Sequence, residues 1–299
     1  MHENMPWGAN LMQVVGKGTI VVGHQSIVSS DVEITFLDSE GTVYIGDYCN
    51  IASKVKIIVS KGSVFIDDWT SIHESCLLLC AENLKIGQHC WFGQHCVLDG
   101  TAGLTIGNSV RVGMYSQIWS HVAAGEQFEG CVLFSEKPVF IEDNVWLVGS
   151  CICSPGVTIK KFATALSQSV ITKSIREYEV VAGSPASAKP NMCFYQPISL
   201  QAKFNMVVQW LNEFNQCVNG KYKILVNEDY ICISCSNESI EFFCSNNSYK
   251  KSKIDNSLSQ NVSVNLAEKI YTKKHTCLEE ALFKFLSNNK VRFLRDNCT

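Results

Sequence analysis

Several features that mark other classes of protein are missing from this chain. No stretch approaches 18 uninterrupted apolar residues, the length that a membrane-spanning helix needs. The first residues, MHENMPWGANLMQVVGKG, lack the charged segment and apolar run of an export signal. Neither sign of charge dominates, and the net charge of −3 excludes a bulk attraction to nucleic acid. We therefore expect a cytoplasmic protein that neither inserts into a membrane nor binds nucleic acid.

A six-residue repeat is present instead, and it is clearest between residues 141 and 189. A helix buries a residue every 3.6 positions and a strand every second one, so a period of six fits neither alone. It suits short strands joined at corners, with coils stacked at the spacing of paired strands, about 4.8 Å. The repeat therefore predicts a parallel β-helix. Its blocks begin at Ile141, Leu147, Cys153, Ile159, Ala165 and Ile171, and the fifth place of each block is small.

The repeat also explains many of the 15 cysteines. A chain of this length without an export signal is not expected to form a disulfide framework. Free cysteine behaves as a small apolar side chain, and several cysteines occupy the small fifth place of a block. We interpret these as packing residues rather than zinc ligands or nucleophiles: Cys49, Cys76, Cys90, Cys96 and Cys151.

The same register extends upstream to Ile45, and one corner of each coil carries surplus residues. Coils begin at Ile45, Ile66, Ile86 and Ile106, and each surplus falls in the third block. Before the next coil start, Ile141, this corner carries a much longer loop, over 121–138. A long loop in a tight solenoid often marks a functional site.

The run NVWLVGSCICSPGVTIKK, followed by SVITKS and VVAGSPA, resembles the C-terminal coils of the hexapeptide-repeat acyltransferases. Within this family it is similar to the sugar and polysaccharide O-acetyltransferases. The resemblance covers about 86–189, is weaker over 20–85 and ends by about residue 195. It implies left-handed coils, whereas parallel crossovers are generally right-handed. We expect a mainly β fold: a left-handed parallel β-helix of hexapeptide repeats with a smaller C-terminal α+β domain.

Four segments follow from these patterns. Residues 1–44 form an N-terminal cap or an irregular first coil, 45–189 the β-helix, 190–198 a linker and 199–299 an α+β domain of unknown role. Within the last segment, apolar spacing predicts helices over 199–220 and 277–290. Strands are predicted for KYKILVN, YICISC, SIEFFC and VRFL, and a mobile loop for SNNSYKKSKIDNSLSQN.

His121 is the predicted catalytic residue. It opens the loop over 121–138, a placement similar to that of the catalytic histidine of hexapeptide acetyltransferases. The imidazole would take a proton from an acceptor hydroxyl as that oxygen attacks an acetyl thioester directly. Glu126, Glu129 and Asp99 are candidates for orienting the ring. The alternative interpretation is a polar histidine on a surface loop.

His95 and Asp99 are the predicted acceptor-binding residues. Counted by coils, His95 lies one coil below His121, where related sugar acetyltransferases carry an acceptor-binding asparagine. Asp99 opens the next small loop. A metal site like that of the γ-class carbonic anhydrases is not favoured, because His89 and His95 lie one face apart and His121 has no nearby partner. No metal is expected.

The resemblance implies that acetyl-CoA is the co-substrate and lies along the last coils. Its pantetheine arm would follow the main chain near Gly149 and Ser167, with Thr172 and Lys173 further along. Trp146 would form a wall near the acetyl group, and Gly149 is a candidate donor to the oxyanion. The phosphates need cations, and the nearby ones are Lys160, Lys161, Lys173, Arg176 and Lys189.

These features together predict an acetyl-CoA-dependent O-acetyltransferase that acts on a sugar hydroxyl of a polysaccharide or its precursor. The resemblance implies a homotrimer in which the loop and histidine of one subunit face the coils of the next. An alternative is N-acetylation of a nucleotide-linked amino sugar, although no GxGxxG segment precedes Ile45. A second alternative is a non-catalytic β-helix scaffold whose C-terminal domain binds a partner.

Overall fold

The computed structural model divides into two compact units, Met1–Tyr195 and Gln196–Thr299. Their boundary falls inside the predicted linker over 190–198. The described part of the chain contains no helix that is long and apolar enough to cross a membrane. Residues 1–11 of the predicted N-terminal cap lie outside it, since the structure describes residues 12–38, 41–123, 125–235, 237–256 and 259–296.

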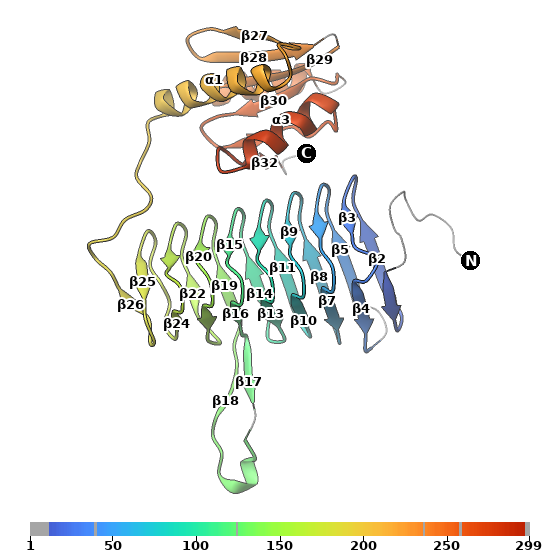
Figure 1. The fold of residues 1–299 in the computed structure, drawn as a ribbon, viewed down its shortest axis with the longest axis vertical. Coiled ribbons are helices and arrows are strands. Elements are labelled where there is room, and N and C mark those ends of the chain that lie inside the picture. The colour runs from blue at the N-terminus through green and yellow to red at the C-terminus, as the bar shows by residue number, and fades with distance from the viewer. Residues whose placement is uncertain (1–11, 39–40, 124, 236, 257–258, 297–299) are drawn as a thin grey trace. The chain divides into compact units, whose positions relative to one another are not determined.

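The first unit winds through three sheets, which we call A, B and C (Figure 1). Every strand pair in these sheets is parallel except β25 with β26. In stacking order, sheet A contains β1 (Gln13–Val15), β4 (Glu33–Phe36), β7 (Lys56–Val59), β10 (Leu77–Cys80), β13 (Val97–Gly100), β16 (Gln117–Ile118), β21 (Ile152–Cys153) and β24 (Val170–Ile171). Sheet B contains β2 (Gly18–Val22), β5 (Gly41–Ile45), β8 (Ser63–Ile66), β11 (Asn83–Ile86), β14 (Leu104–Ile106), β19 (Val139–Ile141) and β22 (Thr158–Ile159). Sheet C contains β26 (Ser187–Ala188), β25 (Val180–Ala182), β23 (Thr164–Ala165), β20 (Trp146–Leu147), β15 (Arg111–Val112), β12 (Trp91–Phe92), β9 (Ser71–Ile72), β6 (Asn50–Ile51) and β3 (Ile27–Val28).

The predicted block starts form the core of this unit. Ile66 pairs with Ile86 one coil later, and Ile86 pairs in turn with Ile106, so identical places stack into a buried column. The five cysteines assigned to the fifth place are also buried and free. The predicted fold, a left-handed parallel β-helix of hexapeptide repeats with a smaller C-terminal α+β domain, is confirmed.

The corners depend on a left-handed residue at the fourth place of nearly every block. This conformation is uncommon for residues other than glycine, yet here it recurs with φ near 60°. The cost is offset because most of these residues donate their main-chain N–H to a carbonyl of the preceding coil, as His89 does to Asp68 and His95 to Glu74. The left-handed corner residues include Tyr48, Trp69, His89, His95, Ser109, Tyr115, Asn144, Phe162, Gln168 and Tyr178.

The β-helix begins earlier than Ile45, where the sequence pattern placed its first regular coil. Val22 pairs with Ile45, Val28 with Ile51 and Ile34 with Ile57, so strands β2 to β4 already follow the six-residue period. The pattern was obscured by Ile27, which is 67% exposed, whereas its neighbour Val28 is 7% exposed and faces the core. Of the two alternatives for residues 1–44, the described part therefore forms a coil.

The long loop forms a hairpin that projects from the corner where strands of sheet A lead into sheet B, here called the A–B corner (Figure 1). It consists of β17 (His121–Ala123), the 3₁₀ helix η1 (Gln127–Glu129) and β18 (Phe134–Glu136), with β17 and β18 antiparallel. At its base, Lys137 donates its N–H to the carbonyl of Ser120. This closure fixes the start of the hairpin, and with it His121, against the stacked coils.

Among its described residues, the second unit contains one six-stranded sheet and three helices. The predicted helices at both ends and the four predicted strands are present. The predicted mobile loop after residue 244 was wrong, because it contains helix α2. This polar helix has little apolar periodicity, and hydrogen bonds from Tyr249 to Asp296 and from Ser252 to Glu241 attach it to the sheet. The elements are α1 (Leu200–Cys217), β27 (Lys223–Val226), β28 (Tyr230–Cys235), β29 (Glu238–Phe243), α2 (Asn246–Asp255), β30 (Val262–Asn265), β31 (Ile270–Tyr271), α3 (Cys277–Ser287) and β32 (Leu294–Arg295).

Candidate active site

Strand alternation and coil stacking bring His121 and Asp99 together at the A–B corner. Successive residues of a strand point to opposite faces, and Ile118 and Ser120 are buried in the interior. Trp119 and His121 therefore lie on the outer side. One coil below, Leu98 pairs with Ile118, which places Asp99 directly under this segment. The two polar residues are thus neighbours although they are 22 positions apart in the chain.

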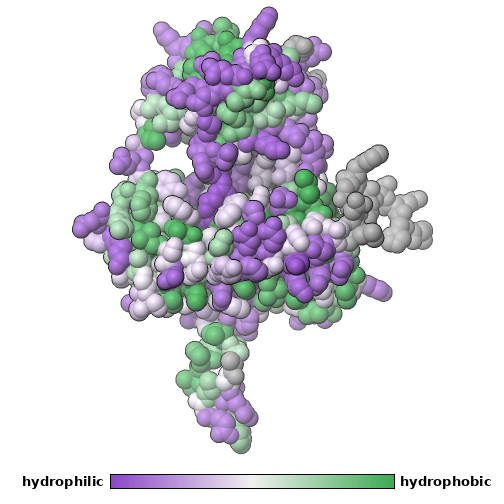
Figure 2. Space-filling view, viewed as in Figure 1, coloured by the Kyte–Doolittle hydropathy of each residue, from purple (hydrophilic) through white to green (hydrophobic). Residues whose placement is uncertain are grey.

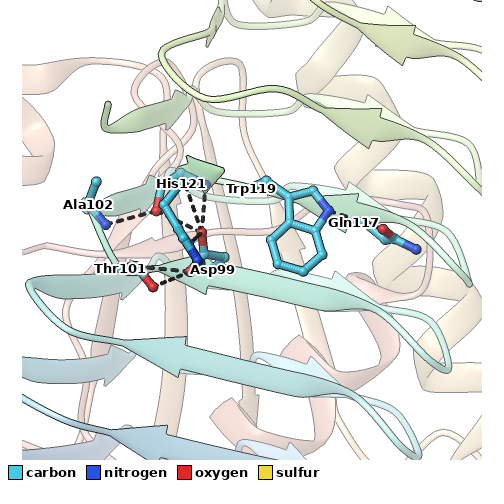
Figure 3. A network of polar contacts seen from close by, with 7 residues as sticks. Asp99, Thr101, Ala102, Gln117, Trp119 and His121 are labelled. Carbon is cyan, nitrogen blue, oxygen red and sulfur yellow. Dashed lines mark hydrogen bonds and ion pairs between the residues drawn. The ribbon is translucent and has the colours of Figure 1, made fainter. Parts of the chain in front are cut away.

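The carboxylate of Asp99 holds the imidazole of His121 in place (Figure 3). Oδ2 of Asp99 lies 2.8 Å from Nδ1 of His121 and also accepts the main-chain N–H of His121 at 3.0 Å. The N–H and hydroxyl of Ser120 donate to the same oxygen, and Thr101 donates both its N–H and its hydroxyl to Oδ1. Asp99 is fully buried, whereas 31% of the His121 side chain is exposed. A buried carboxylate with both oxygens hydrogen-bonded therefore holds an imidazole ring that remains accessible.

These contacts keep Asp99 ionised. Burial by itself raises the pKa of this carboxyl, but hydrogen bonds from Thr101, His121 and the main chain of Ser120 outweigh it and lower the pKa below its usual value. An ionised carboxylate only accepts hydrogen bonds. Nδ1 of His121 must therefore carry the hydrogen, and in the neutral ring Nε2 is left as the acceptor. This is the tautomer that a general base requires.

The structure decides among the carboxylates considered for orienting His121. Asp99 is bonded to the ring, whereas Glu126 and Glu129 lie at the η1 turn at the far end of the hairpin. Asp99 was predicted to bind the acceptor, but its position under His121 with both oxygens engaged suits a positioning role. The sequence analysis missed Thr101 and Ser120. Counting one coil back from His121 along the repeat would have indicated Thr101.

His95 lies apart from this cluster. It is a left-handed corner residue that precedes β13, whereas Asp99 lies at the other end of the same strand. Its ring stacks on that of Tyr115 in the next coil, with centroids 5.1 Å apart and an interplanar angle of 4°. The predicted acceptor residues His95 and Asp99 therefore do not meet within one chain.

The residues predicted to bind acetyl-CoA lie at two places on the last coils. Gly149 and Ser167 occupy the corner where sheet C leads into sheet A, the C–A corner, and are stacked in consecutive coils because Leu147 pairs with Ala165. Exposed Trp146 lies just before this corner on the outer side of β20. Thr172 and Lys173 are exposed and follow β24 at the A–B corner.

The predicted phosphate-binding cations differ in availability. Lys160 forms an ion pair with Glu142 at 2.7 Å, and Arg176 forms one with Glu179 at 2.8 Å. The ammonium of Lys189 donates to the hydroxyl of Ser187 at 3.4 Å, at the last strand of sheet C. Because ion pairing occupies Lys160 and Arg176, the better candidates of this set are Lys161, Lys173 and Lys189.

Within the described ranges, no three side chains of histidine, cysteine, aspartate or glutamate come together as a metal site would require. The Cys-x-x-Cys spacing at Cys232 and Cys235 falls on one strand, β28. Residues three apart on a strand point to opposite faces, so this spacing does not form a chelating pair.

Known proteins match part of this chain. No family model matches the chain. Nodulation protein L of Rhizobium meliloti (strain 1021) is 34% identical over 109 residues, which are 36% of this chain and 59% of that protein. Galactoside O-acetyltransferase of Lactococcus lactis is 31% identical over 107 residues, 36% of this chain and 42% of that enzyme. The chain thus spans about half the length of the curated relatives it matches. These matches confirm the resemblance to the acyltransferases of the hexapeptide-repeat class.

Solved structures also match the chain, at low similarity. The polysialic acid O-acetyltransferase OatWY gives a TM-score of 0.48 at 21% identity and covers 68% of this chain and 99% of its own. A mutant of AntD, an N-acyltransferase from Bacillus cereus, gives 0.42 at 13% identity, covering 66% and 91%. Both scores and both identities are too low to indicate a shared activity.

Proposed function

We propose that the protein is an acetyl-CoA-dependent O-acetyltransferase that acts on a sugar hydroxyl of a polysaccharide or its precursor. The observation that carries the proposal is the partly exposed imidazole of His121, held by buried Asp99 at the base of a projecting hairpin. The sequence match to a named galactoside O-acetyltransferase supports a sugar as acceptor.

His121 acts in this proposal as the general base. Its Nε2 takes the proton of the acceptor hydroxyl while that oxygen bonds to the carbonyl carbon of the thioester. The carbon–sulfur bond then breaks, and the proton held by His121 passes to the leaving thiolate. Asp99 keeps the ring in the required tautomer and stabilises the imidazolium that forms between the two steps. No covalent intermediate on the protein is needed.

The last coils hold acetyl-CoA, which supplies the activated acetyl group. Ser167 and Thr172 are exposed corner residues that an extended ligand can reach, and the Gly149 corner offers main-chain groups without a side chain. Lys173 and Lys189 supply positive charge for the phosphates. Trp146, with its exposed indole, forms the wall near the acetyl group.

A homotrimer completes the site, because one chain does not bring its parts together. Gly149 lies at the C–A corner and His121 at the A–B corner, so a strand of sheet A separates them. The segment between the two corners in the coil of Gly149, residues 150–154, has five residues, and in extended form it spans roughly 15 Å, too far for direct transfer. In the trimer, the hairpin and His121 of one subunit face the Gly149 corner of its neighbour. The projecting hairpin carries apolar surface, drawn green in Figure 2. Phe128 is 91% and Val132 94% exposed, and such a contact needs apolar side chains of this kind.

The test is CoA release from acetyl-CoA, followed by chromatography because 15 cysteines would react with thiol dyes. Acceptors should include methyl glycosides of galactose, glucose and N-acetylglucosamine, sialic acid oligomers, and a nucleotide-linked amino sugar. We expect release that depends on a sugar hydroxyl and falls by a factor of about 10² to 10⁴ in His121→Ala, while acetyl-CoA still binds. Equal CoA release by the wild type and His121→Ala would refute the role of His121 as general base. Transfer only to the amino group of the nucleotide-linked sugar would establish N-acetylation. If acetyl-CoA neither binds nor reacts, the alternative of a non-catalytic β-helix scaffold is favoured.

A further inference from the structure

The outer side of sheet A carries an indole beside His121 that the transfer step does not use. Trp119 lies two residues before His121 on the same side of the chain, and the ring centroids are 6.2 Å apart with the planes at 74° (Figure 3). The imidazole edge thus meets the indole at a steep angle, which leaves both rings directed toward the outside of the same corner.

The indole is held in one orientation. Its Nε1 donates to Oε1 of Gln117 at 3.1 Å, and Gln117 is the preceding outward residue, in β16. The main-chain N–H of Trp119 donates to the carbonyl of Cys153 in the following coil at 3.1 Å. A tryptophan fixed at both the main chain and the ring nitrogen loses little further freedom when a ligand binds.

In the adjacent coils, the residues at the position equivalent to Trp119 are small or have side chains directed elsewhere. Because Ile118 pairs with Cys153, the residue beside Trp119 in the following coil is Ser154. In the preceding coil the equivalent residue is Asp99, whose carboxylate turns toward His121. No bulky side chain from either coil therefore stands in this column over the indole, and Trp119 remains partly exposed.

We propose that Trp119 forms the acceptor subsite, where the flat C–H face of a pyranose ring stacks on the indole and one ring hydroxyl reaches Nε2 of His121. The inference rests on the proposed function and specifies how the acceptor is recognised. A sugar ring offers an apolar face and a polar rim, and an aromatic side chain beside a hydrogen-bonding base matches both. Trp119 is then the residue that selects a cyclic sugar over an open-chain polyol.

The test compares two acceptors, the best methyl glycoside found in the panel and glucitol, an open-chain polyol. The proteins are the wild type, Trp119→Leu, Trp119→Phe, and Trp91→Leu as a matched control on the outer side of sheet C. We expect Trp119→Leu to raise the KM for the glycoside about tenfold and to leave the KM for acetyl-CoA unchanged. The ratio of kcat/KM for glycoside over glucitol should fall about tenfold, and Trp119→Phe should recover most of it because a ring face remains.

The outcomes separate this inference from the proposed function. Suppose that the wild type transfers acetyl groups and Trp119→Leu keeps the wild-type preference for glycoside over glucitol. The Trp119 subsite is then refuted, whereas the proposed acetyltransferase function is not. An equal loss with both acceptors, or a loss matched by Trp91→Leu, also refutes it, because general damage to the coil would affect both acceptors alike. If the wild type transfers nothing, the proposed function fails and the subsite fails with it.

Discussion

Nδ1 of His121 lies 2.8 Å from Oδ2 of Asp99, across a step of one coil in the β-helix. The repeat places the two residues in consecutive coils, and the hairpin base fixes the direction of the ring. Since Asp99 is fully buried and His121 is partly exposed, the pair combines an ionised support with an accessible base.

Asp99→Asn should reduce kcat by a factor of about 10² to 10⁴, because an amide can donate to Nδ1 and favour the wrong imidazole tautomer. The KM for acetyl-CoA should stay within about twofold, since the coils that hold it are not altered. Steady-state kinetics measure both values. Thr101→Val is the matched control, because it removes one hydroxyl donor to Asp99 and leaves the carboxylate. If Asp99→Asn retains wild-type kcat, Asp99 has no positioning role.

Asp99 should also make stability depend on pH in the acidic range. Its pKa in the folded protein is lowered, so the unfolded chain takes up a proton first as the pH falls. The stabilisation is complete above the unfolded value of about 3.9 and is lost as the pH falls through the lower folded value. Urea unfolding of the wild type and Asp99→Asn checks this, and the gap in unfolding free energy should narrow below about pH 4. A gap that stays constant down to pH 2.5 would contradict it.

Glu279 should have the opposite effect in the C-terminal unit. It is fully buried near the start of α3, and burial raises the pKa of its carboxyl to about 7. Oε2 accepts the N–H of Lys274 at 2.9 Å, while Oε1 has no hydrogen-bond partner among the described residues. Because the folded pKa exceeds the unfolded value, the stabilisation is complete below about pH 4 and is lost as the pH rises through 7.

The loss should amount to roughly 3 kcal/mol between pH 4 and 8. Hydrogen exchange of the peptide that covers α3 (Cys277–Ser287), corrected for the intrinsic effect of pH, measures it in the intact chain. Glu279→Gln should remove most of the pH dependence. Exchange that depends on pH equally in both proteins would assign the effect to another group.

Cysteine reactivity should follow burial rather than position in the sequence. Cys90 is buried between coils, and this burial raises the pKa of its thiol to about 12, so almost no thiolate forms at pH 8. Cys193, Cys217 and Cys277 are exposed. Iodoacetamide at pH 8, read by mass spectrometry, should modify the exposed thiols and leave Cys90 free until the protein is unfolded in urea. Rapid labelling of Cys90 in the folded protein would show that the coils open.

Two inactive variants should restore activity when they assemble together. His121→Ala lacks the base, and Ser167→Trp fills the corner where the pantetheine arm is proposed to lie. If each site uses His121 of one chain and the Ser167 corner of another, mixed trimers contain some sites with both residues intact. Co-expressed variants should therefore regain a substantial fraction of wild-type activity. A mixture as inactive as either parent would place the whole site within one chain.

The sequence alone determined the coil register, the core column and the corner at which His121 lies. These follow from a six-residue period, in which an apolar block start must face the interior wherever it occurs. The first coil stayed undecided between a cap and an irregular coil because Ile27 is apolar but points outward, which obscures the six-residue period. Helix α2 was missed for a related reason: tertiary hydrogen bonds to Glu241 and Asp296 hold it, and a local pattern does not record such bonds.

Only the tertiary structure decided which group supports His121, and that His95 does not join it. The repeat placed Asp99 one coil below, but a strand residue can turn its side chain along the sheet or away from it. The choice depends on how many donors surround the carboxylate once it is buried, and here Thr101 and Ser120 supply them. The same holds for Trp119, whose ring position depends on Gln117 and on the small residue that stacks beside it. Periodicity specifies which residues stack, whereas side-chain direction is set by contacts between coils that are distant in sequence.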